Sequence, residues 1–537
     1  MEFTVTVAKY IVHQLTRWGV RNIYGVSGDA IFPLLDALGR QEEINFYAVA
    51  HEGTAAFMAA AEGRLTGRPG VCVATGGPGA VNLLNGLADA YFDRVPVLAI
   101  TGQVAGSQIG TRIKQYLDQQ ILFNQVSDHS ALLVNPQAII NVLYSSMRQA
   151  IAQRTVSHIA IPKDIFQTTL TLETYPLPDY GARLPGEIIG DLQQATDLMK
   201  KAIKPLILVG RGTWEMGKPM AALAQKWGAG IITALSSRTL MAHSFPLLIG
   251  GLGEAYLPPV LYEADLLLQI GEAPYEEKYL PAQLPTIRVE IAPGGPAKPR
   301  PGNQALLTGE PGLILGALIT GLNGHQPDRQ WLARIEQIRQ DKTAEINEYT
   351  RDNTRPVMPQ RVIAALNQTL PQDALLVFDT GEFMHWFNWG FQASGHQQMI
   401  LSDYWRCMGA GLPQALGAQV TFPQRKVVVL AGDGGFHLAL AEVATAVKYH
   451  LPVKVVVFNN GIFALEKHKM AKGGLKPFAY EVPAMDFSLL AQAYGAEGYR
   501  VEDPAILHPV LAQAFNSPNP AIVDIITASP LPDTMLP

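Results

Sequence analysis

Cysteine and charge are both scarce in this chain of 537 residues. Cys72 and Cys407 are the only cysteines, too few for a disulfide framework or for a zinc site built from thiolates alone. Charged residues make up 16% of the chain, and the 41 basic residues are outnumbered by 46 acidic ones. Because no basic stripe interleaved with aromatic residues occurs, we expect no nucleic-acid partner.

Long apolar runs are also absent. No stretch approaches the roughly 18 consecutive apolar residues of a membrane-spanning helix. The N-terminal sequence MEFTVTVAKYIVHQL lacks the basic flank and the continuous apolar core of a signal peptide. We therefore expect no membrane span and a cytoplasmic location, where both cysteines stay reduced.

Short apolar runs and amphipathic helical patterns are what the chain does contain. They alternate in three successive segments, which is typical of parallel α/β sheets covered by helices. We predict an α/β fold with three doubly wound parallel-sheet domains, covering residues 1–170, 188–325 and 355–530. Stretches rich in proline and glycine, at 174–187 and 293–303, interrupt the pattern between and within these segments.

Two predicted strands of the last segment end in polar residues. One runs into Asp433, which is flanked by glycines, and the next ends at Asn459-Asn460. The intervening segment is long enough for one crossover helix, and a right-handed crossover brings both strand ends to the same edge of the sheet. Asp433, Asn460 and the backbone carbonyl of Ile462 would then supply the hard oxygen ligands that Mg²⁺ prefers. Either strand end alone is more typical of an ordinary turn, but the two together favour a metal site.

Glycines around Asp433 favour an anion beside that metal. Gly432, Gly434 and Gly435 have no side chain where a diphosphate must approach the backbone, and the N-terminus of the next helix favours negative charge. The combination resembles the thiamine-diphosphate fingerprint of the 2-oxo-acid decarboxylase superfamily. The resemblance implies a pyrimidine-binding, a central and a diphosphate-binding domain, in the order of the three segments, with thiamine diphosphate and Mg²⁺ as cofactors.

The same resemblance implies a catalytic acid in the first segment. His51-Glu52 matches the glutamate motif of the superfamily, in which the carboxyl group hydrogen-bonds the aminopyrimidine of thiamine and promotes loss of the proton on thiazolium C2. Taken alone, Glu52 is more typical of an acid at a helix N-terminus. In the superfamily this glutamate faces the diphosphate site of another subunit, which implies a homodimer or homotetramer with shared active sites. Four further residues match cofactor-binding positions of the first domain: Gly28, Gly76, Pro78 and Asn82.

Residues of the last segment match other cofactor-binding positions. Met408 falls where the superfamily places a bulky apolar side chain beneath the cofactor, although a methionine that fills a gap in the core is the alternative. Gly381, Phe383 and Met384 match a loop on the phosphate side of the cofactor. Glu382 stands where a neutral residue is expected, and beside a diphosphate it should point away.

Decarboxylation of a pyruvate-like 2-oxo acid through an enamine is the reaction that the resemblance implies. Oxidation through a flavin, attack on a second carbonyl and protonation are the three fates of that enamine. Three stretches are most similar in sequence to pyruvate oxidases and next most similar to acetolactate synthases: residues 65–103, 161–166 and 447–460. We therefore expect a pyruvate-oxidase-like reaction, with acetolactate-synthase-type carboligation or non-oxidative decarboxylation as alternatives.

Three polar residues bear on the substrate. Gln115 matches a family glutamine close to the thiazolium and is expected to be catalytic. Lys114 replaces an aromatic residue there, so it either holds a second carboxylate or phosphate of the substrate or is simply solvated. Glu466 sits where non-oxidative decarboxylases carry a catalytic glutamate, and a surface position is an equally good interpretation.

FAD is a candidate second cofactor of the central segment. The sequence GRGTWEMG, residues 210–217, is a loose glycine pattern after a predicted strand. Ala292 stands where pyruvate-oxidase-like central domains carry an acid. Two other classes remain open, a catalytically silent family member and a nicotinamide enzyme. Intact Glu52, Asp433 and Asn460 argue against the first, and the lack of a full G-x-G-x-x-G followed by an acid about 20 residues later argues against the second.

Overall fold

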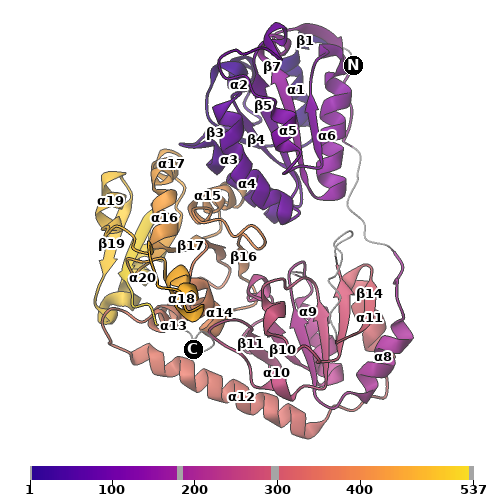
Figure 1. Cartoon of the computed structure of the whole chain (residues 1–537), viewed down its shortest axis with the longest axis vertical. Helices are drawn as coiled ribbons and strands as arrows, with labels where there is room; N and C mark the ends of the chain where they lie inside the picture. The colour runs from indigo at the N-terminus through magenta and orange to yellow at the C-terminus, as the bar shows by residue number, and fades with distance from the viewer. Residues whose placement is uncertain (1–2, 178–185, 214, 292–301, 531–537) are drawn as a thin grey trace.

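The computed structural model describes residues 3–177, 186–213, 215–291 and 302–530. Figure 1 shows three α/β units that follow one another along the chain, each built on one parallel sheet with helices on both faces. Each of the three sheets has six strands. The prediction of three doubly wound parallel-sheet domains is therefore confirmed, whereas Ala292 lies outside the described residues.

In the first unit the strand order is β3-β2-β4-β5-β7-β6, and all neighbours are parallel. Its strands are β2 (Asn22–Gly25), β3 (Asn45–Ala48), β4 (Gly70–Ala74), β5 (Val97–Gln103), β6 (His129–Leu132) and β7 (Val156–Pro162). Its helices are α1 (Val7–Arg17), α2 (Phe32–Gly39), α3 (Glu52–Thr66), α4 (Pro78–Phe92), α5 (Gln119–Phe123), α6 (Ile139–Gln153) and α7 (Lys163–Phe166). A separate antiparallel pair, β1 (Phe3–Thr6) with β8 (Thr169–Leu172), joins the two ends of this unit.

The central unit has a different strand order, β11-β10-β9-β12-β13-β14. Its strands are β9 (Pro205–Val209), β10 (Gly230–Thr233), β11 (Leu248–Gly251), β12 (Leu266–Ile270), β13 (Thr286–Glu290) and β14 (Asn303–Thr308). Its helices are α8 (Leu192–Lys201), α9 (Gly217–Trp227), α10 (Val260–Glu263) and α11 (Pro311–Gly321). The long helix α12 (Arg329–Glu348) then leads to the last unit.

The last unit repeats the strand order of the first, as β16-β15-β17-β18-β20-β19. Its strands are β15 (Leu375–Phe378), β16 (Gln398–Ile400), β17 (Val427–Gly432), β18 (Lys454–Asn459), β19 (Glu497–Val501) and β20 (Ala521–Ile526). Its helices are α13 (Pro359–Thr369), α14 (Phe383–Gly390), α15 (Gly411–Thr421), α16 (Asp433–Leu438), α17 (Val443–Lys448), α18 (Ala464–Lys472), α19 (Phe487–Ala493) and α20 (Leu507–Asn516). One expectation is wrong here, because the crossover between β17 and β18 is not one helix: α16 and α17 are separated by the 3-10 turn η7 (Leu440–Glu442).

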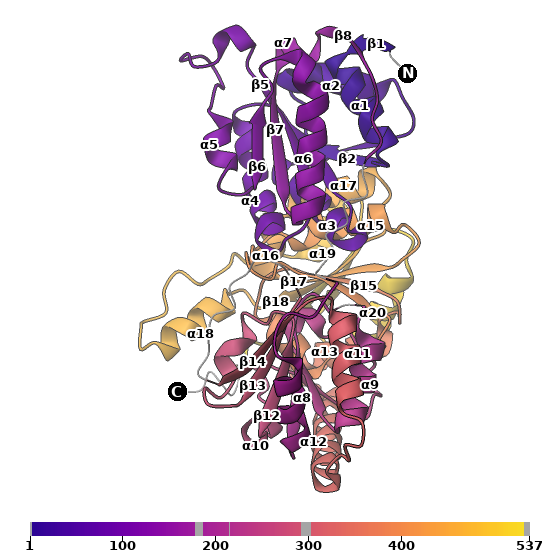
Figure 2. The same cartoon turned by 90° about the vertical axis from the view of Figure 1, so that its right-hand side faces the viewer.

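Helices α3 and α15 pack the first unit against the last one (Figure 2). Small residues let their backbones approach closely, because a Cβ atom on Gly417 of α15 would overlap the carbonyl of Met58 on α3. Buried alanines of both helices belong to one hydrophobic core that spans the two sheets. In the described part of the chain, no helix is long and apolar enough to cross a membrane.

Candidate active site

Asp433 and Asn460 lie at the same edge of the last sheet. Strands β17 and β18 are parallel neighbours with Gly432 opposite Phe458, so the residues that follow them come together. The two carboxylate oxygens of Asp433 accept hydrogen bonds from the backbone N–H groups of Gly434 (2.8 Å) and Gly461 (2.6 Å). The side chain of Asp433 is only 4% exposed, and this burial raises the pKa of its carboxyl group. The placement expected from the sequence is therefore present.

A cavity opens at this edge of the sheet. Its walls contain most of the residues that the sequence singled out in the last segment: Gly381, Phe383, Met408, Gly432, Asp433, Gly434, Gly435, Asn460, Ile462 and Glu466. Gly434 packs so closely on the ring of Phe463 that any Cβ atom there would overlap it. Met384 is not part of the wall, because its position on α14 turns it into the hydrophobic core.

Asp379, which follows β15, organises the loop that carries Met408. Its carboxylate accepts hydrogen bonds from the N–H groups of Gly409 (3.0 and 3.1 Å) and Gly411 (3.1 Å). Burial raises the pKa of Asp379 to about 6. No local sequence pattern indicates this role, because the bonded groups lie about thirty positions away along the chain.

Glu382 does not point away from the site as expected. Its side chain lies in the cavity wall, 7% exposed, and accepts hydrogen bonds from Ser529 Oγ (3.0 Å) and from Asn460 Nδ2 (3.5 Å). Burial raises the pKa of Glu382 to about 7. With Nδ2 bonded to Glu382, the amide of Asn460 is held with its oxygen on the side of the Ile462 N–H group (3.2 Å).

Glu466 lies at the rim of the cavity, on helix α18, which projects from the body of the chain in Figure 2. Its side chain is exposed and pairs with Lys469 over 3.3 Å. His468, two positions after Glu466 on this helix, is buried with Nδ1 3.6 Å from Glu382 Oε1, and burial lowers the pKa of His468. The structure therefore allows both interpretations of Glu466, at the cavity and at the surface.

A second group of predicted residues gathers at the corresponding edge of the first sheet. Glu52 opens helix α3, and Asn82 on α4 donates a hydrogen bond from Nδ2 to Glu52 Oε2 (2.9 Å). Gly28 lies against the side chain of Thr75, so closely that a Cβ atom there would overlap it. Because these residues follow β2, β3 and β4, the parallel sheet brings them to one edge.

The remaining predicted residues of the first segment lie in the neighbouring turns. Gly76 touches the carbonyl of Gly102, with no room for a side chain, and Pro78 begins helix α4. Gln115 has a left-handed backbone, with φ of 64°, and its carbonyl lies against Gly77. The side chains of Gln115 and Lys114 are exposed.

Glu442, which the sequence did not single out, links the two edges. It lies between α16, the helix that begins at Asp433, and α17, and it is almost fully buried. Its carboxylate accepts hydrogen bonds from the N–H groups of Ala50 (3.3 Å) and His51 (3.1 Å), just before Glu52. The N–H group of Ala48 donates to the hydroxyl of Tyr449 (2.7 Å). The last domain therefore holds the backbone that presents Glu52.

Within one chain the two edges do not form a single site. Among the residues that the structure describes, those lining the cavity lie between Pro359 and Ala528, and none comes from the first unit. Glu52 bonds instead to Asn82 of its own unit. A second chain would be needed to bring a residue of the first edge onto the cavity.

The donor set at the cavity fits Mg²⁺ bound to a diphosphate. It offers a buried carboxylate at Asp433, an amide oxygen at Asn460 and the backbone at Ile462, all oxygen ligands that Mg²⁺ shares with phosphates. No cluster of three or more histidine, cysteine, aspartate or glutamate side chains suited to a metal occurs among the residues described, so protein carboxylates alone do not build this site. Glycines on both sides of the cavity leave its backbone accessible to an anion.

Family models match all three units of the chain. The N-terminal thiamine pyrophosphate (TPP) binding domain matches residues 5–127, the central domain of thiamine pyrophosphate enzymes matches 192–318, and the C-terminal TPP binding domain matches 379–525. These matches cover the edge with Glu52 as well as the cavity with Asp433.

Curated proteins of similar length align with nearly the whole chain. The putative thiamine pyrophosphate-containing protein YdaP of Bacillus subtilis is 31% identical over 98% of this chain and 93% of its own length. Pyruvate oxidase of Lactiplantibacillus plantarum is 28% identical over 97% of this chain and 89% of its own. The large subunit of acetolactate synthase isozyme 1 from Escherichia coli is 28% identical over 97% and 93%. The chain therefore belongs to the thiamine pyrophosphate enzyme family.

Proposed function

We propose that this protein is a thiamine-diphosphate- and Mg²⁺-dependent enzyme that decarboxylates a pyruvate-like 2-oxo acid. The observation that carries the proposal is the pairing of Asp433 and Asn460 at the ends of neighbouring strands, in the wall of one cavity. A buried carboxylate with hydrogen bonds only from backbone N–H groups is costly unless a cation joins it. Membership of the family supplies the identity of the cofactor.

Some residues of the cavity would bind the metal and the cofactor, and others would shape the cavity around the cofactor. Asp433, Asn460 and the carbonyl of Ile462 would hold Mg²⁺, and the backbone around Gly434 would face the diphosphate. Met408, held in place by the bonds of Asp379 to the next residues, would support the rings of the cofactor from below. Thiamine diphosphate, once bound, supplies the electron sink for loss of CO₂.

Glu52 is the proposed acid–base group. Asn82 fixes one oxygen of its carboxyl group at 2.9 Å, and Glu442 fixes the backbone before it, so the carboxyl group is oriented from two sides. A positioned carboxyl group can give and take the proton that activates the cofactor. Because Glu52 does not line the cavity of its own chain, we infer that its carboxyl group acts at the cavity of a partner chain.

Self-association is therefore part of the proposal, as a homodimer or a homotetramer with shared active sites. Exposed apolar side chains support it: Val81 and Phe92 on α4, Trp405 and Leu438. Trp405 stacks on Phe92 at 5.2 Å and is 42% exposed, and Leu438 is 67% exposed. Burying such side chains against a second copy would stabilise the dimer.

Three reactions of the decarboxylated substrate are open at this site: oxidation, attack on a second carbonyl and protonation. One relative is named pyruvate oxidase and others are named acetolactate synthase, at closely similar identities. Exposed Lys114 and Gln115, on the loop between β5 and α5, are the side chains available to select among 2-oxo acids.

A reconstitution experiment tests the proposal. Protein freed of small ligands would be incubated with thiamine diphosphate, Mg²⁺ and pyruvate, with and without an artificial electron acceptor, and the released CO₂ and the products would be identified. We expect CO₂ release that requires both cofactors. Equal release after omission of either cofactor, or no release from pyruvate and a panel of other 2-oxo acids, would contradict the proposal.

A further inference from the structure

The central domain has the strand order of a dinucleotide-binding sheet. In such a sheet, ligands lie outside the carboxyl ends of the strands, at the point where the order reverses. In the order β11-β10-β9-β12-β13-β14, that point lies between β9 and β12. A flavin dinucleotide bound in the usual way would place its diphosphate at the turns that follow these two strands.

Backbone hydrogen bonds close this crevice. The N–H group of Arg211 donates to the carbonyl of Glu272 (2.7 Å), and the N–H group of Glu272 donates back to the carbonyl of Arg211 (3.3 Å). Gly210 and Gly271 lie so close to the opposite strand end that a Cβ atom on either would overlap its backbone. The amide groups of Arg211 and Glu272 are thus each bonded to a carbonyl on the opposite side of the crevice.

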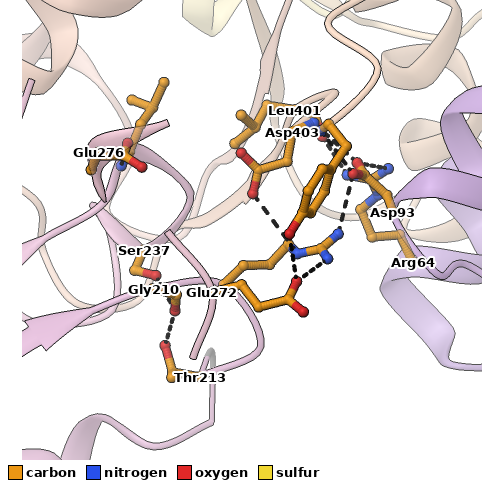
Figure 3. Close-up of polar contacts among 12 residues, drawn as sticks. Arg64, Asp93, Gly210, Thr213, Ser237, Glu272, Glu276, Leu401 and Asp403 are labelled. Atoms are coloured by element: carbon orange, nitrogen blue, oxygen red, sulfur yellow. Dashed lines mark hydrogen bonds and ion pairs between the residues drawn. The ribbon is translucent and has the colours of Figure 1, made fainter. Parts of the chain in front are cut away.

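Polar contacts hold the side chains at the mouth of the crevice, as Figure 3 shows. The carbonyl of Gly210 accepts hydrogen bonds from Thr213 Oγ1 (2.8 Å) and Ser237 Oγ (2.6 Å). The guanidinium of Arg211 pairs with Glu272 and lies 4.7 Å from the centre of the Tyr404 ring, whose hydroxyl donates to Glu272 (3.2 Å).

The same arginine joins the central domain to the other two. Its Nη1 pairs with Asp93, at the end of α4, over 3.1 Å, and its Nε lies 3.9 Å from Asp403 in the last domain. Asp93 also pairs with Arg64 (2.9 Å) and accepts hydrogen bonds from the N–H groups of Asp403 and Tyr404 (3.1 Å each). Three carboxylates thus surround Arg211, so a diphosphate here would replace or oppose them.

We propose that this crevice is a closed three-domain junction and not a flavin site, and that the enzyme works without bound FAD. This inference rests on the proposed function and narrows it. With no flavin in the protein and no external electron acceptor, the electron pair left by departing CO₂ forms a bond to a proton or to carbon. One 2-oxo acid anion and one proton then give an aldehyde and CO₂, or two anions and one proton give a 2-hydroxy-3-oxo acid anion and CO₂.

Counting both cofactors in one sample tests the inference. The protein would be purified with excess FAD, thiamine diphosphate and Mg²⁺, freed of unbound ligand and denatured, and the released flavin and thiamine diphosphate would each be measured per chain. We expect thiamine diphosphate near one per chain and flavin near zero. Flavin near one per chain would overturn the inference whatever the thiamine content, whereas loss of thiamine diphosphate alone would count against the proposed function only.

A second measurement tests the junction itself. Arg211→Met keeps the length of the side chain but removes its charge, and its matched control is Arg40→Met, whose ion pair with Asp36 is exposed. We expect Arg211→Met to lower the midpoint of thermal unfolding clearly more than Arg40→Met, with flavin binding still near zero. Equal midpoints for the two variants, or flavin binding gained by Arg211→Met, would overturn the assignment of Arg211 as a structural tie.

Discussion

The first and last domains have the same strand order but different residues at equivalent strand ends. Strands β3 and β16 occupy the same place in their sheets, yet one leads to Glu52 and the other to the loop with Met408. Strands β4 and β17 are equivalent in the same way, and they lead to the Gly76–Pro78 turn and to Asp433. In the proposed function, one scaffold therefore offers an acid for proton transfer in one copy and an acid for metal binding in the other. The chemistry resides in the strand-end turns, not in the sheet.

Replacing the acid of the first domain should have the largest effect. Glu52→Gln keeps the size of the side chain but removes its proton-transfer ability, so we expect kcat to fall about 1,000-fold. Binding of thiamine diphosphate, measured by calorimetry, should stay unchanged. Glu62→Gln, on the same helix but bonded to Tyr24, is the control that should keep kcat. Near-normal kcat in Glu52→Gln would mean that the first edge has no catalytic role.

Replacing the acid of the last domain should act on binding instead. Asp433→Ala removes the carboxylate ligand, and we expect Mg²⁺ and thiamine diphosphate to bind about 100-fold more weakly, a loss of about 3 kcal/mol. Asp36→Ala, at an exposed acid, serves as the control. If the affinities of Asp433→Ala matched those of the control, the metal assignment would be wrong.

Mixing the two inactive variants tests whether the edges come from different chains. A mixed dimer of Glu52→Gln and Asp433→Ala has one site with both natural residues, so random exchange of subunits should restore about a quarter of the wild-type activity. Activity would be followed after the two proteins are unfolded and refolded together. A mixture as inactive as its components would show that each site uses residues of one chain only.

Weakening the link between the two edges should have a smaller effect. Glu442→Ala leaves the N–H groups of Ala50 and His51 without their carboxylate, so Glu52 loses orientation and kcat should fall about 10-fold. Faster amide hydrogen exchange in residues 48–52 of the cofactor-free protein would show the loosened backbone directly. Glu442→Gln keeps an acceptor oxygen, so its kcat should lie between that of the wild type and that of Glu442→Ala. Unchanged exchange in Glu442→Ala would rule out this positioning role.

The smallest expected effect concerns the stability of the central domain, which shares neither strand order nor proposed chemistry with the other two. Burial, followed by the nearby charge of Asp403, raises the pKa of Glu276 to about 7 from an ordinary value of 4.5. The folded state then binds the proton of Glu276 more tightly than the unfolded state does. The stability that this proton contributes is therefore fully present below pH 4.5 and is lost as the pH rises through 7. Glu276→Gln should flatten the dependence between pH 5 and 8 and raise stability at pH 8 by about 2 kcal/mol in denaturant unfolding. An unchanged pH profile would contradict this.

Local patterns in the sequence were sufficient for the fold class and for the pairing of Asp433 with Asn460. Apolar runs that end in polar residues mark strand ends, and parallel topology alone brings them together. The strands that the sequence did not reveal include β6, β16 and β19, which are short and only partly buried, so their apolar signal is weak.

Long-range contacts explain what the sequence could not reveal. Glu442 accepts a hydrogen bond from a backbone N–H group 391 positions away, and no local sequence pattern indicates such a contact. Met384 follows two residues that line the cavity or its rim, but the phase of helix α14 turns its side chain into the core. The closed crevice at Arg211 likewise depends on acids from three domains.

The close contact of Gly417 with Met58 limits where this architecture can change. Helices that touch backbone to backbone tolerate almost no added volume, so the seam between the first and last domains is fixed in composition. The strand-end turns carry this restriction at single glycines, such as Gly28 and Gly434, and not along a whole helix. New substrate specificity can therefore arise by changes in the strand-end turns. The contact between α3 and α15 meanwhile preserves the relative orientation of the first and last domains.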